Sequence, residues 1–311
     1  MNINLSKIKT YSISKRKSRV AINIFAKPQR KGQRFKDFYN SLPQILKAED
    51  FKISVDSIIK AYKNHKPVIF LLGAHVIKCG LSPLIIQLIK KGIINAVALS
   101  GAGMIHDFEI ASNGKTSEDV LKGLMDGSFG MAKETAGFLN NSTSEAARND
   151  EGLGFTVGKN IKEANLRYKD LSILYNCYLK KIPATVHVAI GTDIIHQHPN
   201  FRGEDAGKAS LSDFHILIGA LAEIGNGGVV VNIGSAVILP EVFLKALTIT
   251  RNLGYKTFNF TSVNFDMLHQ YRPQQNIVSR PTQPRGKGFY ITGHHEIMVP
   301  LLTAAILEKL S

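Results

Sequence analysis

Seven of the ten histidines lie in short segments that each follow a predicted β-strand. Neutral imidazole is the usual general base near pH 7, and it is also a common ligand of transition metals. Because these segments make up a minority of the chain, the clustering predicts that at least two of the histidines contact a substrate or take part in catalysis. The candidate catalytic residues are His106, His196, His198, His269 and His295.

The spacing of some of these histidines also allows a second interpretation. His196 and His198 form a His-x-His pair, and His294 and His295 are followed directly by Glu296. Imidazole and carboxylate groups at such spacings can hold a divalent metal, which would activate a water molecule. The alternative site is therefore a metal centre with the ligands His196, His198, His294 and Glu296.

Small residues follow two further strands and could approach a ligand closely. Ser100-Gly101-Ala102-Gly103 comes after one strand, and Gly234-Ser235 comes after another. Such turns either contact phosphate through their backbone N–H groups or simply allow tight turns and close helix packing. Asp193 lies in a similar turn, where its carboxylate could cap the next segment or accept a hydrogen bond from a ligand hydroxyl.

The elements that must position these residues are apolar runs that alternate with amphipathic stretches. This alternation predicts an α/β fold with a mostly parallel sheet and helices on both faces. Ligands then bind beyond the carboxyl ends of the strands. Residues 140–160 are polar and rich in glycine, and we expect them to form a loop. We expect strands at 67–73, 96–100, 185–190, 228–233, 257–261 and 288–292, and helices at 55–65, 81–91, 117–139, 171–181, 212–224, 240–253 and 296–310.

The net charge of +15 is concentrated at the N-terminus. Residues 1–36 contain 11 Lys or Arg and no acidic residue, so the rest of the chain carries only +4. We expect residues 1–50 to be a basic arm that packs on a neighbouring subunit, and residues 51–311 to be a single α/β domain. A targeting peptide or a nucleic-acid-binding arm are the alternatives for this segment, although nucleic acid is not the partner we expect.

Other features of the composition indicate the cellular compartment in which we expect the protein. No apolar run approaches the ~18 residues that a membrane span needs. Two cysteines, Cys79 and Cys177, are too few for a disulfide framework and lack metal-type spacing. We therefore expect a cytoplasmic protein with no membrane partner.

Several stretches, taken in order, resemble the deoxyhypusine synthase family. Residues 67–109 (PVIFLLGAHVIKCGLSPLIIQLIKKGIINAVALSGAGMIHDFE) resemble its first βαβ unit, and residues 182–198 (IPATVHVAIGTDIIHQH) resemble its P…LTDGS segment. NIGSAVILPEVFLKAL, FTSVNFD and IMVPLL then follow in the family's order. The resemblance covers roughly residues 55–311.

The resemblance implies a Rossmann-like domain, tetramers built from tight dimers, and NAD bound between subunits. Members of the family dehydrogenate spermidine and pass its aminobutyl group through an enzyme lysine to a lysine of a translation factor. Carried over by position, the residues that would face NAD are His75, Ser100, Gly101, Ala102, Gly103, Asp193, Gly234, Ser235, Ser262 and His294.

The sequence differs from the family at the residues that carry the family's reaction and bind its substrate. Thr282 stands where the catalytic lysine belongs, and a threonine cannot form the imine that the transfer requires. The family's polyamine-binding acids are replaced by His198, His269 and Gln275, which implies a near-neutral or mildly cationic pocket.

We therefore expect NAD-dependent dehydrogenation or transfer at a C–N or C–O centre of a small molecule rather than hypusine formation. His198 or His269 would be the general base, in a homo-oligomer that we expect to be a tetramer. The alternatives are a metal-dependent lyase or hydrolase that uses the histidine cluster, and a non-catalytic homologue.

Overall fold

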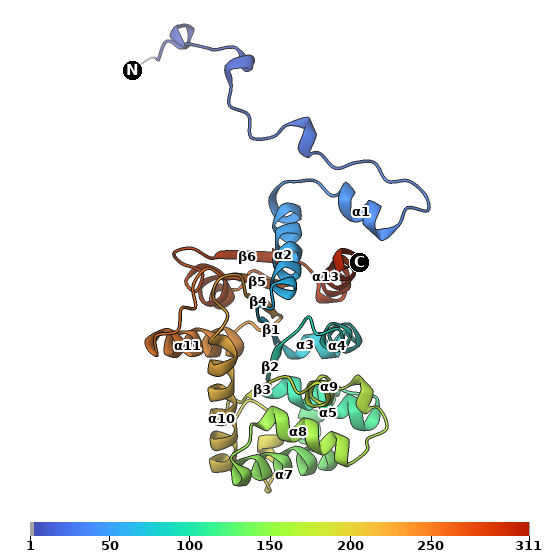
Figure 1. The fold of residues 1–311 in the computed structure, drawn as a ribbon. Coiled ribbons are helices and arrows are strands. Elements are labelled where there is room, and N and C mark those ends of the chain that lie inside the picture. The colour runs from blue at the N-terminus through green and yellow to red at the C-terminus, as the bar shows by residue number, and fades with distance from the viewer. Residues whose placement is uncertain (1–2, 311) are drawn as a thin grey trace.

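A six-stranded, all-parallel sheet forms the centre of the computed structural model, which describes residues 3–310 (Figure 1). The strand order is β3-β2-β1-β4-β5-β6, so the chain builds outward from β1 first in one direction and then in the other. The strands are β1 (Val68–Leu72), β2 (Ala96–Ser100), β3 (Ala184–His187), β4 (Val229–Ile233), β5 (Thr261–Asp266) and β6 (Lys287–Thr292).

The central strands are continuous apolar runs because both faces of the sheet are covered. Every residue of β1 is buried. Side chains alternate between the faces, so Val68, Phe70 and Leu72 join one hydrophobic cluster while Ile69 and Leu71 join the other. This is the pattern expected of a doubly covered parallel sheet.

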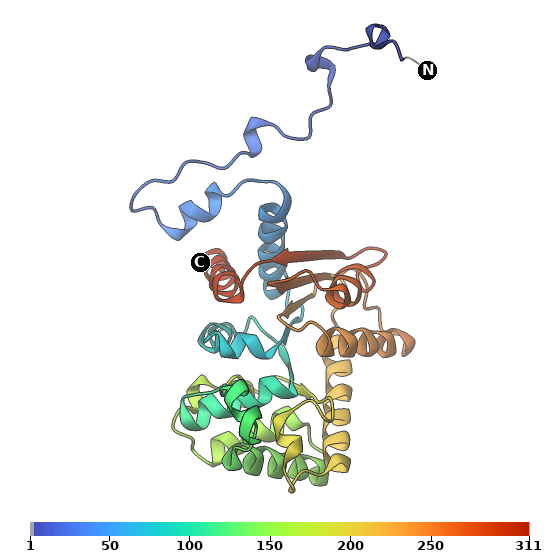
Figure 2. The ribbon, with the colours of Figure 1, turned by 180° about the vertical axis from the view of Figure 1, so that it is seen from behind.

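The helices lie on both faces of this sheet (Figures 1 and 2). On one side α10 (Gly203–Leu221), α11 (Ile238–Asn252) and a π-helical turn, η6 (Gln274–Ser279), supply the smaller apolar cluster. The other side carries the larger cluster. Its helices are α2 (Leu46–Lys63), α3 (Ala74–Lys78), α4 (Ser82–Lys90), α5 (Gly101–Asn113), α7 (Lys133–Asn149), α8 (Leu153–Glu163), α9 (Ile173–Lys180) and α13 (His295–Leu310).

The remaining elements are short. They are the helices α1 (Phe35–Ser41), α6 (Val120–Asp126) and α12 (Tyr271–Pro273) and the 3₁₀ turns η1 (Leu5–Lys7), η2 (Ile13–Lys15), η3 (Ile22–Ile24), η4 (Lys169–Leu171) and η5 (Ile194–Gln197). The predicted α/β class, with a parallel sheet covered on both faces, is confirmed.

Three of the predicted elements are wrong. Residues 140–160 are not a loop, because they contain most of α7 and most of α8. The helix predicted at 117–139 is instead α6, a connection and the start of α7. The strand predicted at 257–261 begins only at Thr261, because Asn259 adopts the left-handed conformation (φ 57°) and breaks the extended run before it.

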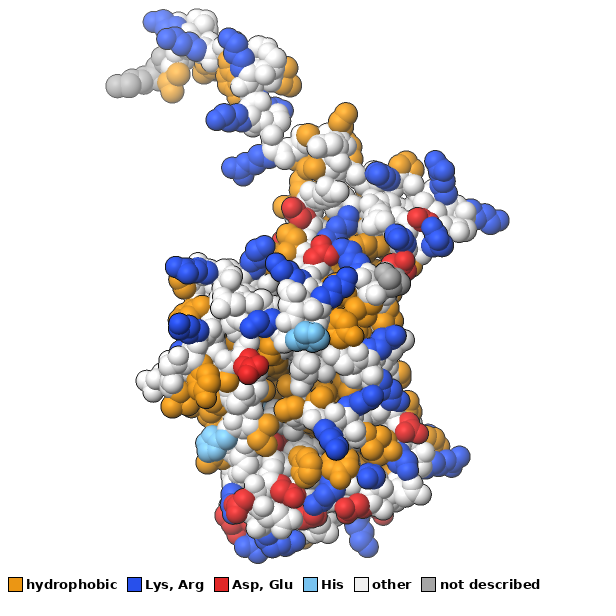
Figure 3. Space-filling view, in the orientation of Figure 1, with side chains coloured by type: hydrophobic (Ala, Val, Ile, Leu, Met, Phe, Trp, Pro, Cys, Tyr) orange, Lys and Arg blue, Asp and Glu red, His pale blue; other side chains and the backbone are white. Residues whose placement is uncertain are grey.

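The N-terminal segment runs away from the body of the molecule as an extended, largely exposed chain (Figure 1). Its lysines and arginines are spread along its length (Figure 3). The boundary that we predicted at residue 50 falls inside α2, and Tyr39 of α1 is already buried against Phe51. In the part of the chain that the structure describes, no helix has the length and apolar character of a membrane span.

Candidate functional site

The turns after β1 and β4 meet at the middle of the carboxyl edge of the sheet. Strand order reverses between these two strands, and such a switch point is where open α/β sheets bind ligands. A Cβ atom on Gly73 would lie 2.1 Å from the carbonyl oxygen of Gly234, and Gly234 itself has a φ of 67°. The two turns can therefore approach this closely only because both residues are glycine.

The turn after β2 starts α5 and receives a carboxylate from the turn after β3. The Ser100 hydroxyl caps the helix by accepting from the Gly103 N–H at 3.3 Å. Asp193 Oδ2 lies 1.9 Å from the position that a Cβ on Gly101 would occupy. Glycine at this position is what allows the carboxylate to reach the N-terminus of α5.

Asp193 is the acidic group at this turn that has an unused acceptor. Its side chain is buried, and Oδ2 has no hydrogen-bond partner. Burial raises the pKa of Asp193 to about 6, although the nearby His106 opposes the shift. The group therefore changes its charge near neutral pH and can accept a hydrogen bond from a ligand.

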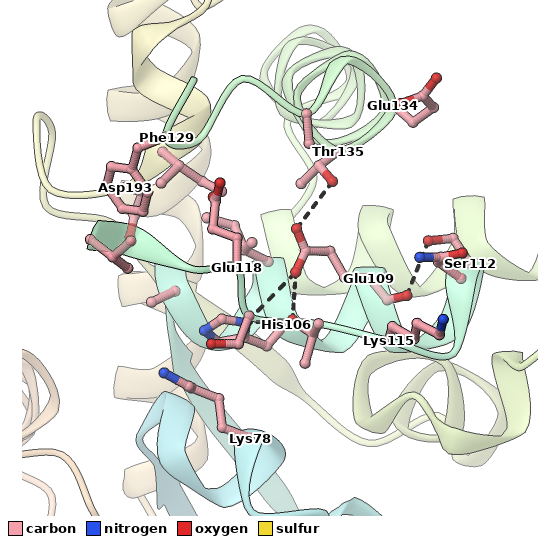
Figure 4. A pocket seen from close by; sticks show the side chains of 18 of the residues that line it. Lys78, His106, Glu109, Ser112, Lys115, Glu118, Phe129, Glu134, Thr135 and Asp193 are labelled. Atoms are coloured by element: carbon pink, nitrogen blue, oxygen red, sulfur yellow. Dashed lines mark hydrogen bonds and ion pairs between the residues drawn. The ribbon is translucent and has the colours of Figure 1, made fainter. Parts of the chain in front are cut away.

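A cavity of about 740 Å³ opens beside this turn, between α5 and the segment that leads to α7 (Figure 4). Lys78, His106 and Asp193 line it on the side of the sheet. Its charged lining consists of four carboxylates and two lysines: Glu109, Glu118, Glu134, Asp193, Lys78 and Lys115. Acids outnumber lysines in its wall, and the near-neutral or mildly cationic pocket that we expected at His198, His269 and Gln275 is a different place, because none of these three residues lines this cavity.

His106 is held in the cavity by a short chain of hydrogen bonds. Its Nδ1 lies 2.6 Å from Thr116 Oγ1, and that hydroxyl donates to Glu109 Oε2 at 2.5 Å. Thr135 donates to the other carboxylate oxygen at 3.2 Å. Burial of Glu109 opposes ionisation, but the nearby His106 and the hydrogen bonds from Thr116 and Thr135 outweigh it and lower the pKa of Glu109. The acid is therefore an anion that fixes the surrounding donors.

Two other candidate histidines lie near the cavity but use their ring nitrogens for local structure. His196 Nδ1 accepts from the backbone N–H groups of Gly191 and Asp193, at 3.1 and 3.2 Å, and so fixes the turn that carries Asp193. His198 Nε2 lies 2.8 Å from the carbonyl oxygen of Gly130 and donates to it. Both histidines thus position the wall of the cavity.

The remaining histidines lie at the middle and the far edge of the sheet. His295 is buried beside Gly234, and neither of its ring nitrogens has a partner. Burial lowers its pKa, so the ring is neutral near pH 7. His75 is exposed, with its ring centroid 6.5 Å from that of His295. His294 points to solvent.

His269 is an exposed residue in the segment that follows β5. Its ring packs on Tyr290 with centroids 4.4 Å apart, and its Nε2 lies 3.2 Å from Gln274 Oε1. It follows β5, whereas His198 follows β3, so four strand spacings of about 4.8 Å separate the two. The two histidines therefore do not belong to one constellation.

Two residues that the family resemblance placed in the site are inside the protein. Ser262 lies within β5 rather than after it, and its buried hydroxyl donates to the Ile277 carbonyl at 2.6 Å. The hydroxyl is therefore engaged inside the sheet, and contact between Ser262 and NAD stays a prediction. Thr282 is also buried, with its hydroxyl donating to the Val278 carbonyl at 2.7 Å.

The alternative metal centre is not assembled. His196 and His198 follow β3, and His294 and Glu296 follow β6, which are the two opposite edge strands of the sheet. Within residues 3–310, no group of three or more His, Cys, Asp or Glu side chains could hold a metal ion.

Glu109, Thr116 and Thr135 are part of the cavity that the sequence reasoning missed. Glu109 follows His106 by three residues, and that spacing places both side chains on one face of a helix. The pair could have been found from the sequence had α5 been predicted. No local signal pointed to Thr116, which belongs to the loop after α5, or to Thr135, which belongs to α7.

Comparison with known proteins supports the fold. No protein-family model matches the sequence, and no curated protein matches it. A protein described as a deoxyhypusine synthase from Entamoeba histolytica is 11% identical, with a TM-score of 0.52 over 89% of this chain and 94% of its own. A conserved LOR/SDH protein from Methanococcus maripaludis S2 is 15% identical, with a TM-score of 0.52 over 86% and 72% of the two chains.

A third similar structure is AgrE, solved as a ternary complex with ornithine and NAD+. It is 14% identical with a TM-score of 0.54, and the match covers 85% of this chain but only 33% of AgrE. The chain thus spans about a third of the length of AgrE. Together with the strand order, these matches show that the chain has the deoxyhypusine synthase-like fold, a parallel α/β sheet of the Rossmann type.

Proposed function

We propose that this protein is an NAD-dependent enzyme that dehydrogenates a small molecule at a carbon bearing nitrogen or oxygen. The observation that carries the proposal is the cavity, in which His106, fixed by an ionised carboxylate, lies beside the N-terminus of α5 and the unpaired Asp193 oxygen. The fold is similar to that of AgrE, which was solved with ornithine and NAD+, and this similarity supports the proposed use of NAD.

The residues at the middle of the sheet edge fit a dinucleotide. Gly73 and Gly234 leave room for a close backbone approach, and the N-terminus of the 13-residue α5 attracts phosphate. Asp193 Oδ2 can accept from a ribose hydroxyl, and buried His295 has a free donor and a free acceptor. NAD would supply the hydride acceptor at this position.

The wall of the cavity fits a small zwitterion such as an amino acid. Lys78 and Lys115 can bind a carboxylate, and the acidic side chains opposite them can bind an amino group. His106 then accepts the proton of the N–H or O–H group as the neighbouring carbon loses hydride, which leaves a C=N or C=O double bond. We assign the base to His106 rather than to His198 or His269, because His198 Nε2 is engaged by Gly130 and His269 lies outside the cavity.

The proposal excludes transfer through an enzyme lysine at the family's position. Thr282 is buried with its hydroxyl bound to backbone carbonyls, so it faces no substrate. The tetramer and the cytoplasmic setting that the sequence suggests belong to this proposal as well.

The affinity for NAD should depend on the ionisation of Asp193. An ionised carboxylate accepts more strongly from a hydroxyl than a protonated one. With the pKa of Asp193 raised to about 6, the ionised fraction, and with it the NAD affinity, should fall about tenfold between pH 7 and pH 5. Titration of NAD into the protein by calorimetry at several pH values, supported by the NAD-induced rise in Tm, measures this.

Asp193→Asn should bind NAD weakly at both pH values and lose the pH dependence, whereas Asp56→Asn, on the exposed side of α2, should behave as the wild type. His196 Nε2 lies 3.8 Å from Asp193 Oδ2, and burial lowers the pKa of that histidine. Absence of NAD binding by the wild type at every pH would refute the proposed function.

A further inference from the structure

The hydrogen-bond chain at His106 determines which ring nitrogen carries the proton. Thr116 has one hydroxyl hydrogen, and the carboxylate of Glu109 can only accept. The hydrogen of Thr116 therefore goes to Glu109 Oε2, as the 2.5 Å contact shows. Thr116 must then accept at its other contact, so the proton lies on His106 Nδ1.

We infer that Glu109 and Thr116 are positioning residues that hold His106 in the tautomer whose Nε2 is unprotonated and faces the cavity. A base needs this lone pair toward its substrate, and a carboxylate behind the ring both fixes the tautomer and stabilises the imidazolium that forms. The inference rests on the proposed function only where it says that His106 accepts its proton from a substrate. The tautomer itself is a property of the free protein.

Geometry and burial favour a stable arrangement. The side chains of His106 and Glu109 each have only 17% of their surface exposed, and Glu109 Oε2 lies 3.7 Å from His106 Nδ1. Thr135 donates to Oε1 of the same carboxylate at 3.2 Å, whereas Thr116 donates to Oε2. The Glu109 carboxylate lies beside the His106 ring (Figure 4), and Thr116 Oγ1 bonds to both groups.

The other charged groups around the ring come from different elements. Lys78 projects from α3, Asp193 comes from the turn after β3, and Glu118 precedes α6. None of these three groups hydrogen-bonds to the ring, whereas Thr116 does. The relay through Thr116 is therefore the contact that selects the tautomer.

Thr116 belongs to the loop after α5, and this loop is part of the cavity wall. Gly130, which binds His198, lies at the other end of the same segment, and its N–H donates to Glu118 at 3.0 Å. The segment from 114 to 130 thus supplies partners for two histidines. Correct placement of this segment is needed for His106 to present Nε2.

The test is the tautomer of His106 in protein labelled with ¹⁵N-histidine, read from two-bond ¹H–¹⁵N correlations at pH 8 without added ligand. The signal is assigned by its loss in His106→Gln. We expect Nδ1 of the wild type at the shift of a protonated nitrogen and Nε2 at that of an unprotonated one. A wild-type ring protonated at Nε2 would overturn the inference without any variant.

The variants separate the relay from general effects on packing. Thr116→Val keeps the shape of the side chain but removes the hydroxyl, so we expect the population of the Nδ1–H form to drop by several-fold. Thr116→Ser should restore it. The matched control is Thr135→Val, which removes a hydroxyl from the other oxygen of the same carboxylate and should leave the tautomer unchanged.

An unchanged tautomer in Thr116→Val, or an equal change in Thr135→Val, would contradict the role of Thr116. NAD binding is measured separately on the same samples. A protein that shows the expected tautomer but does not bind NAD would retain the relay and lose the proposed reaction, so the two conclusions fail independently.

Discussion

Replacing Asp213 by alanine should lower the free energy of unfolding by roughly 2–6 kcal/mol, because two buried N–H groups lose their acceptor and each costs about 1–3 kcal/mol. Asp213 lies on α10, and its Oδ2 accepts from Gly154 N–H at 3.0 Å and from Val186 N–H at 2.7 Å. It thereby joins three elements: α10, the start of α8, and β3. Urea unfolding followed by circular dichroism measures the change.

The penalty should also depend on pH. Burial raises the pKa of Asp213 to about 7, although the N–H groups of Val186 and Gly154 oppose the shift. Between about pH 4 and pH 7 the folded state therefore holds a proton that the unfolded state has lost, and this contribution to stability decreases as the pH rises. Asp213→Ala lacks the group, so its penalty should be larger at pH 5 than at pH 8.

Asp56→Ala is the matched control, since this carboxylate is exposed and forms a surface ion pair with Lys309. It should cost at most about 1 kcal/mol. Equal losses for the two variants, or a larger penalty for Asp213→Ala at pH 8 than at pH 5, would show that the buried carboxylate does not have this role.

Substituting alanine for Gly73 should destabilise the protein by about 3 kcal/mol, because the new Cβ meets backbone that cannot move aside freely. The nearest atom is the Gly234 carbonyl oxygen, at 2.1 Å. Relief requires the turns after β1 and β4 to separate, so we also expect weaker NAD binding from this variant. Thermal and urea unfolding give the first quantity, and calorimetry gives the second.

Gly137 offers the opposite case within the same chain. It lies inside α7, with no neighbouring atom within 4 Å of an added Cβ. Gly137→Ala should therefore raise the free energy of unfolding by about 0.5–1 kcal/mol through helix propensity. If both alanine variants were equally stable, the close approach of the two turns would not be a constraint on the fold.

Much of the sheet could be predicted because its strands are defined by their own residues. Val68–Leu72, Ala96–Ser100 and Val229–Ile233 are apolar runs bounded by turn residues, and the structure places strands there. Local composition is sufficient for such segments, since both faces are covered and every side chain can be apolar.

The errors arise where distant partners satisfy polar residues. Asn232 and Asn264 lie side by side inside β4 and β5, and the amide of one donates to the other at 2.5 Å. Neither sequence segment reveals that pairing, so residues 262–266 were placed after the predicted strand instead of inside β5. Residues 140–160 were expected to be a loop because they are polar, but Asp213 satisfies the N-terminus of α8 from 59 residues away.

The candidate site likewise contains some residues that could be predicted from the sequence and others that could not. His106 and Asp193 were predicted from residue type and from their place after strands, and both line the cavity. Their partners could not be predicted, because Thr116 and Thr135 reach Glu109 only once α5, the following loop and α7 have packed together.

The strand order also has a consequence for synthesis on the ribosome. β1 pairs with β2 shortly after both emerge, but its other neighbour, β4, lies about 160 residues further along the chain. At a translation rate of about 5–20 residues per second, one edge of a fully apolar strand stays unpaired for roughly 8–30 s. A nascent chain with this topology should depend on chaperones that bind exposed apolar segments until β4 has been made.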